Sequence, residues 1–185
     1  MDAALPLPIT CEPSLAATLD HWVSLCAEPA FAALPYRKVE TKANGDVLLM
    51  SPARSRHSVL QSRIAKLLER EADLHSIEGA ALAECPVLTR DGVKVPDVAW
   101  AGADQVRRNL EQPAFLDAPL VCIEVLSPSN TSREMIDKAA LYFAAGAREV
   151  WLCADDGLMR FIGPQGDRAG SAVFPGFPAK VTVVT

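Results

Sequence analysis

The chain has 185 residues, half of them apolar and 22% charged, which is an ordinary globular composition and excludes a disordered or fibrous chain. Its formal net charge of −5 excludes a general basic field that would hold nucleic acid by counterion release. A nucleic-acid partner would therefore need a local basic patch, or metal ions bound to the acidic groups.

Targeting and membrane signals are not expected in this chain. The first residues, MDAALPLPITCEPS, have an acid at position 2, no basic segment and several prolines, so they do not resemble a signal peptide. No apolar run approaches the length of a membrane span. The cysteines lie far apart without a C-x-x-C pair, so we expect reduced thiols, a cytoplasmic protein and no zinc site. They are Cys11, Cys26, Cys85, Cys122 and Cys153.

The first third of the chain predicts a helix and a hairpin. Residues 1–13 are expected to form a loose arm, and residues 14–185 a single domain. Apolar residues recur at spacings of three and four within residues 14–34, which predicts one amphipathic helix with Ser14 as its N-cap. The dipeptide Asn44-Gly45 then predicts a hairpin between strands near 36–42 and 46–50.

The segment SRHSVLQSRIAKLLEREADLH gives the clearest helical pattern. Leu60, Ile64 and Leu68 share one face, and Ser55 or Ser58 is the expected N-cap. Basic residues on or near the first half of this helix form the notable positive cluster of the chain. They are Arg54, Arg56, Arg63 and Lys66.

Beyond residue 76 the pattern changes to short strands. They are expected at 80–88, 94–100, 120–126, 149–153, 159–162 and near 180–184, with turns at 90–92 and 156–157. A polar stretch at 102–118 is expected to be a loop, and the helix after the third strand is expected to end at Gly146. This order predicts one α/β domain around a mixed sheet. The strand at 120–126 is apolar on both faces, so we expect it to be central.

Two acids interrupt apolar strands: Asp97 in VKVPDVAW and Glu124 in LVCIEVLSPS. An uncompensated ion in the protein interior is strongly destabilising, and two facing carboxylates repel unless one takes up a proton or a cation lies between them. Such oxygen ligands suit Mg²⁺ or Mn²⁺, which can polarise a phosphoryl oxygen and activate water. Lys138, two turns into the following helix, is expected to reach the pair and either balance its charge or stabilise negative charge developing on a phosphate.

The segments PDVAW, LVCIEVLSPS and DKAALYFAAGAREVWL resemble the bacterial family of putative restriction endonucleases in the PD-(D/E)XK nuclease superfamily. The resemblance runs from about Tyr36 to about Ile162. It implies a restriction-endonuclease-like core, a mixed sheet flanked by helices, that hydrolyses phosphodiester bonds in nucleic acid, with DNA the expected substrate. Asp97 and Glu124 match the two acids of the superfamily motif, but Leu126 stands where its lysine is usual. Lys138 from the next helix then takes the lysine's role.

The resemblance assigns further residues of the site. Glu40, before the glycine hairpin, and the backbone carbonyl of Val125 are expected to join Asp97 and Glu124 as metal ligands. His57 matches a histidine that often opens the helix, with a bond to backbone as the alternative. The residues expected to contact nucleic acid are Arg54, Arg56, His57, Arg63 and Arg133, with Arg107 and Arg108 as further candidates.

Two other interpretations stay open. The acidic net charge and the missing strand lysine favour a non-catalytic nuclease fold kept as a binding or assembly module. Alternatively, Asp97, Glu124 and Lys138 form a purely structural ion network, which apolar residues can often replace without loss of stability. A homodimer is compatible with a nuclease acting on a duplex. The helix at 14–34 is expected to belong to the core rather than to an interface.

Overall fold

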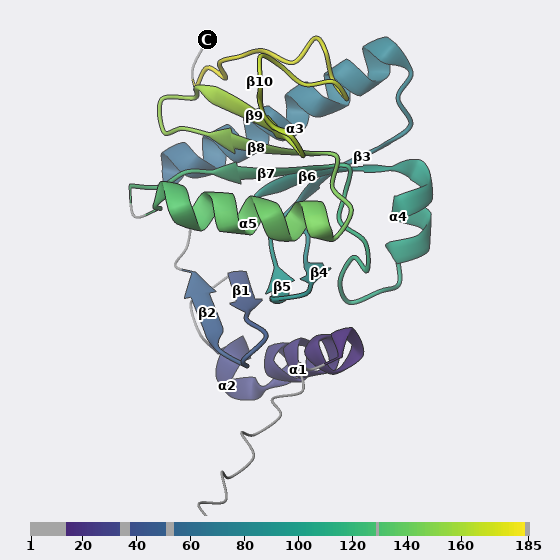
Figure 1. Ribbon diagram of the computed structural model, residues 1–185, viewed down its shortest axis with the longest axis vertical. Helices are drawn as coiled ribbons and strands as arrows, with labels where there is room; N and C mark the ends of the chain where they lie inside the picture. The colour runs from purple at the N-terminus through teal and green to yellow at the C-terminus, as the bar shows by residue number, and fades with distance from the viewer. Residues whose placement is uncertain (1–13, 34–37, 51–53, 129, 184–185) are drawn as a thin grey trace, which may run out of the picture.

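The computed structural model describes residues 14–33, 38–50, 54–128 and 130–183, so the expected arm at 1–13 lies outside them, as does Cys11. A six-stranded mixed sheet forms the centre of the fold, in the order β10-β9-β8-β7-β6-β3 (Figure 1). Its strands are β3 (Gly79–Ala83), β6 (Val98–Gly102), β7 (Val121–Val125), β8 (Glu149–Cys153), β9 (Met159–Gly163) and β10 (Gly166–Arg168). Strands β7 and β8 are parallel and their neighbours antiparallel, and β7 lies inside the sheet as predicted.

Two long helices cover opposite faces of this sheet (Figure 1). On one face, α3 (Ser55–His75) buries Leu60, Ile64 and Leu68 against Trp100 and Trp151 of the strands. On the other face, the apolar side of α5 (Ser132–Ala144) packs against a cluster of buried side chains around Cys122 of β7. Because side chains alternate along β7, Ile123 and Val125 face α3, whereas Cys122 and Glu124 face α5.

The ends of these helices partly agree with the sequence. Arg54 is the N-cap of α3 and makes no side-chain capping bond, so the predicted serine caps are wrong: Ser55 is already the first helical residue. Gly146 follows the end of α5 with a φ of 110°, as its role in ending this helix predicts. Within the described ranges, no helix combines the length and apolar character needed to cross a membrane.

Two small hairpins lie below the main sheet in Figure 1. The first, β1 (Lys38–Thr41) with β2 (Val47–Met50), turns at Gly45 as the Asn-Gly signal predicts. The second joins β4 (Val87–Thr89) to β5 (Gly92–Lys94). The predicted strands at 80–88 and 94–100 are therefore each divided in two. Glu84 breaks the first with a φ of 48°, and Pro96, which has no N–H to donate, separates β5 from β6.

The N-terminal helical segment differs from the prediction in two ways. It consists of α1 (Leu15–Ala27) and α2 (Pro29–Ala32), because a residue before proline avoids the helical conformation and Glu28 is extended. Ser14 does cap α1, accepting a bond of 3.2 Å from the amide of Ala17. The expected core position of this segment is wrong: α1 packs against the small hairpins, yet Leu15 remains 53% exposed.

Two further elements correct the sequence prediction. The expected loop at 102–118 contains a short helix, α4 (Ala103–Asn109). The Asp117 carboxylate holds α4 by accepting bonds from Gln105 and Asn109, so polar contacts and not apolar periodicity define it. The strand expected near 180–184 is reduced, over its described residues, to one isolated bridge between Leu158 and Lys180.

Candidate active site

Asp97 and Glu124 lie opposite one another at the edge where β6 begins and β7 ends. The antiparallel register pairs Val98 with Ile123, so the next position outward sets Asp97 across from Glu124. Opposed residues of this kind point to the same face of a sheet. Both acids are 5% exposed, so their charges are largely withdrawn from water. The structure thus brings together the two acids that the strand pattern singled out.

Lys38 lies between these two carboxylates. Its Nζ is 2.9 Å from Asp97 Oδ1 and 3.8 Å from Glu124 Oε2. Lys38 is not among the site residues that the sequence predicts. Its position two residues before Glu40 on a strand does place both side chains on one face. That signal was present in the sequence, but it does not reveal which face of the hairpin turns toward the main sheet.

Lys138 contacts Glu124 of the predicted acid pair, and its second carboxylate partner is Glu40 rather than Asp97. Its Nζ lies 2.9 Å from Glu124 Oε1 and 2.8 Å from Glu40 Oε1. One helical turn further, the Tyr142 hydroxyl donates to Glu124 Oε1 at 2.8 Å. Glu40 Oε1 also accepts from the amide of Val95 at 2.8 Å. Carboxylates and ammonium groups therefore alternate through the site, from Asp97 through Lys38, Glu124 and Lys138 to Glu40.

This alternation shifts the protonation equilibria of the site. Burial alone raises the pKa of Asp97, but a hydrogen bond from His57, the charge of Lys38 and the Val125 amide together hold that pKa well below its usual value. Burial raises the pKa of Glu124, and the ammonium groups of Lys138 and Lys38 only partly offset this. Burial lowers the pKa of Lys138, yet the charges of Glu124 and Glu40 outweigh it and raise that pKa. Asp97 and Lys138 are consequently charged near neutral pH.

Helix α3 supplies two further partners of Asp97 from the opposite face of the sheet. His57 Nε2 lies 3.3 Å from Asp97 Oδ2, and Gln61 donates to Asp97 Oδ1 at 3.2 Å. The amide of Val125 donates to Asp97 Oδ2 at 2.7 Å. His57, expected to contact nucleic acid, therefore touches an acid of the site itself. Gln61 is not among the predicted residues, although its spacing of four from His57 put both on one helix face.

The fold places some of the predicted basic residues on elements that reach the site and others away from it. Arg54 is exposed and, as the N-cap of α3, precedes the helical turn that carries His57. Arg63 is partly buried on this helix, whereas Arg56 donates to the backbone carbonyl of Asp155 at 3.2 Å. Arg133, in the first turn of α5, pairs with Asp137 at 3.0 Å. Arg107 and Arg108 lie on α4, which follows the far end of β6, so they are not gathered with Asp97.

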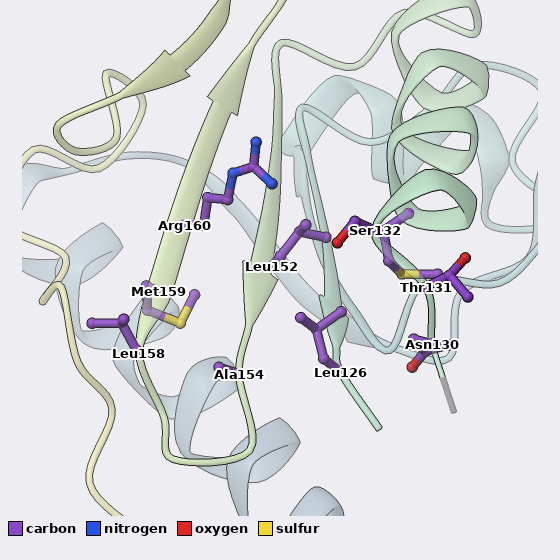
Figure 2. A pocket seen from close by; sticks show the side chains of 10 residues that line it. Leu126, Asn130, Thr131, Ser132, Leu152, Ala154, Leu158, Met159 and Arg160 are labelled. Carbon is purple, nitrogen blue, oxygen red and sulfur yellow. The ribbon is translucent and has the colours of Figure 1, made fainter. Parts of the chain in front are cut away.

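Leu126, in the position of the usual lysine, lines an apolar cavity of about 270 Å³ next to the site (Figure 2). It packs with Met135 and Leu152, which explains how a leucine is accommodated two residues after Glu124. Asn130, Thr131 and Ser132, where the chain enters α5, form the polar side of the cavity, and Arg160 lies across from them (Figure 2). At this position the side chain therefore meets apolar partners and supplies no charge to the site.

The site suits a hard divalent cation by the chemistry of its donors. Carboxylate oxygens of Asp97 and Glu124 converge on one ammonium group, and Mg²⁺ is commonly bound by one or two carboxylates together with water. The Val125 carbonyl is the remaining expected donor. Glu40 is turned to Lys138 and Val95, so it does not face Asp97. In the part of the chain that the structure describes, no group of three or more His, Cys, Asp or Glu side chains is arranged to hold a metal ion.

Comparisons with known proteins agree with the fold. Residues 29–176 match the family described as Uma2, putative restriction endonuclease. No curated protein matches the chain. A similar solved structure is the crystal structure of a putative nuclease belonging to DUF820 from Anabaena variabilis ATCC 29413, with a TM-score of 0.64 and 20% identity over 83% of this chain and 92% of that chain. The predicted fold, a mixed sheet flanked by helices, is confirmed.

Proposed function

Because the chain belongs to the Uma2 family of putative restriction endonucleases, we propose that it is a nuclease that hydrolyses phosphodiester bonds of DNA with Mg²⁺ or Mn²⁺ as cofactor. The family and the fold support nuclease function in general. One observation supports the finer proposal: the buried carboxylates of Asp97 and Glu124 share a cation, the Lys38 ammonium, next to a second ammonium on Lys138.

The proposed roles follow from the contacts of each residue. A divalent cation held by Asp97, Glu124 and the Val125 carbonyl would polarise the phosphoryl oxygen and lower the pKa of water. The Val125 amide and Gln61 fix the Asp97 carboxylate, and Tyr142 fixes that of Glu124, so neither acid has to reorient when substrate arrives.

Lys138 is the proposed electrostatic catalyst. Its ammonium is charged and anchored between Glu124 and Glu40, so it is preorganised to stabilise negative charge that develops on the phosphate. It would thereby take the role of the lysine that the superfamily motif has on the strand, where this chain has Leu126. His57, in contact with Asp97, is proposed to face the same phosphate rather than a distant part of the nucleic acid.

DNA is the proposed partner even though the chain is acidic overall. Arg54 is the N-cap of the helix that carries His57, and Arg63 and Arg133 lie on α3 and α5, the two helices that supply side chains to the site. These side chains would position the backbone by phosphate contacts, without reading sequence. The described cysteines are unpaired, which supports the cytoplasm as the proposed compartment. A homodimer remains a prediction.

Cleavage assays with matched variants test the proposal. With Mg²⁺ or Mn²⁺, purified protein should cut DNA, and Asp97→Asn, Glu124→Gln or Lys138→Met should each lower the rate by about 10²-fold or more, since Asp97 and Glu124 would hold the metal and Lys138 would stabilise negative charge on the phosphate. Glu149→Gln is the control, because Glu149 is a buried strand acid that bonds to Trp151 and Ser171 on the α3 face. A wild-type protein that cuts neither DNA nor RNA with either ion would refute the proposal.

A binding or assembly module that no longer cuts is the second candidate. It is favoured by Lys38, whose positive charge already lies between the two acids, and by the leucine at position 126. Titration calorimetry with Mn²⁺ separates the two candidates. Mn²⁺ binding that Glu124→Gln abolishes supports the nuclease. No Mn²⁺ binding by wild type, together with a binding or assembly function that Glu124→Gln leaves unchanged, supports the module.

A further inference from the structure

Two buried lysines, Lys38 and Lys94, and the partly buried Lys138 lie around the site, and in the described part of the chain only Lys38 pairs with both Asp97 and Glu124. Lys138 bridges Glu124 to Glu40 instead. Lys94 donates to the carbonyls of Thr41 and Asp91, at 2.7 Å and 2.5 Å. The Lys38 ammonium thus occupies the position that a cation shared by the two strand acids would take.

We propose that Lys38 is a resident substitute for the divalent cation: its ammonium holds the acid pair in the metal-free protein and leaves when the metal binds. This inference rests on the proposed function, because it requires that Asp97 and Glu124 are the metal ligands. It goes beyond that function by assigning a competitor for the metal within the chain itself.

Electrostatics requires the exchange. Without a cation, two buried carboxylates facing each other repel, so removal of Lys38 would leave the metal-free site poorly compensated. With a divalent cation between the same oxygens, an ammonium in that gap would be repelled by like charge. One position therefore holds either the Lys38 ammonium or the metal, but not both.

The fold allows Lys38 to move while Lys138 stays. Lys38 sits on β1, a four-residue strand in a two-stranded sheet, so its long side chain can withdraw without disturbing the pairing of β6 with β7. Lys138 is held by carboxylates on both sides and lies on α5, which packs on the main sheet. Glu40 keeps its bonds from Lys138 and Val95 in either state.

Mn²⁺ binding to the full chain tests this exchange, measured by titration calorimetry for wild type, Lys38→Met and Lys42→Met. Lys42→Met is the matched control, because it removes the same charge from an exposed position of the same hairpin. We expect Lys38→Met to bind Mn²⁺ at least about tenfold more tightly, about 1.4 kcal/mol, and Lys42→Met to bind like wild type.

Thermal unfolding gives a second readout that does not depend on activity. Metal-free Lys38→Met should melt below wild type, and Mn²⁺ should raise its Tm by more than it raises that of wild type. Lys38→Gln serves if Lys38→Met does not fold, because its amide still donates to a carboxylate while carrying no charge. It should show the same two changes to a smaller extent.

The outcomes separate the inference from the proposed function. If wild type binds Mn²⁺ and cuts DNA but neither Lys38 variant binds more tightly, the inference fails and the proposed function survives. If no variant binds Mn²⁺ and wild type does not cut, both fail. If only Lys38→Met binds Mn²⁺, both fail for the wild-type protein, because its own lysine then fills the metal position permanently and no exchange occurs.

Discussion

Each buried carboxylate of the candidate active site has polar or charged partners that offset the cost of burying its charge. Glu124 accepts from Tyr142 and lies against Lys138 and Lys38, so each of its oxygens has a cationic neighbour. Glu149, a second buried acid on the adjacent strand, is compensated differently, by neutral donors that include Trp151. Cationic partners therefore distinguish Glu124 from Glu149, although both carboxylates are buried.

Tyr142→Phe tests how much one neutral donor contributes to Glu124. The ring keeps its packing against the sheet, while the bond of 2.8 Å to Glu124 Oε1 is lost. Because a hydrogen bond to a charged group contributes about 2 kcal/mol, we expect the free energy of unfolding in urea to fall by about that amount. An unchanged midpoint and slope would show that Lys138 and water fully replace the hydroxyl.

Single residues were predictable where a charge breaks an apolar strand. Asp97 and Glu124 stand out for that reason, and Lys138 follows from the spacing of the next helix. Lys38 and Gln61 do not stand out, because each is one of several polar residues on an otherwise ordinary strand or helix. Their selection depends on how the β1–β2 hairpin and α3 pack on the sheet, which is a tertiary property.

The β1–β2 hairpin beneath the sheet supplies two of the five charged groups of the site. Strand β1 carries Lys38 and Glu40 and is fastened to β5 through Thr41, whose hydroxyl accepts from the amide of Val93 at 3.1 Å. Gly92 completes this contact: its φ is 93°, and a Cβ there would overlap the carbonyl oxygen of Thr41. The close approach of the two backbones at Gly92 therefore fixes β1 below Asp97.

A pair of glycine substitutions tests this fastening. Gly92→Ala and Gly45→Ala both place a side chain at positive φ, but the added Cβ meets no atom within 4 Å at Gly45. Gly45→Ala should therefore lower the free energy of unfolding by about 1 kcal/mol from strain alone. Gly92→Ala should lower it by clearly more, because Thr41 must also move. Equal losses in urea denaturation would contradict the proposed contact.

Elements with a local signal were predicted, and those set by distant contacts were not. The Asn44-Gly45 turn, α3, α5 and β8 carry their own turn chemistry or periodicity, and the structure contains all of them. Helix α4 lacks an apolar period and is held by Asp117. The divisions at Glu84 and Pro96 arise where the chain leaves the main sheet to form the β4–β5 hairpin, which a strand pattern does not reveal.

The whole molecule gathers the site from both faces of one sheet. Asp97 immediately precedes the first residue of β6, and His57 and Gln61 reach it from α3 on one face. Lys138 and Tyr142 reach Glu124 from α5. Helix α5 covers the other face of the sheet (Figure 1). The central strand pair thus acts as the common support, and the order of strands in the sheet determines which side chains meet.

A crystal of the full chain grown with Mn²⁺ tests the central claim most directly, by the anomalous signal of the metal. We predict a manganese peak between the carboxylates of Asp97 and Glu124, with Lys38 Nζ displaced from both and Lys138 still in contact with Glu124. The contrary result is a well-ordered site in which Lys38 still bridges the two acids and no manganese lies between them, which would leave a structural ion network in place of a metal-dependent nuclease centre.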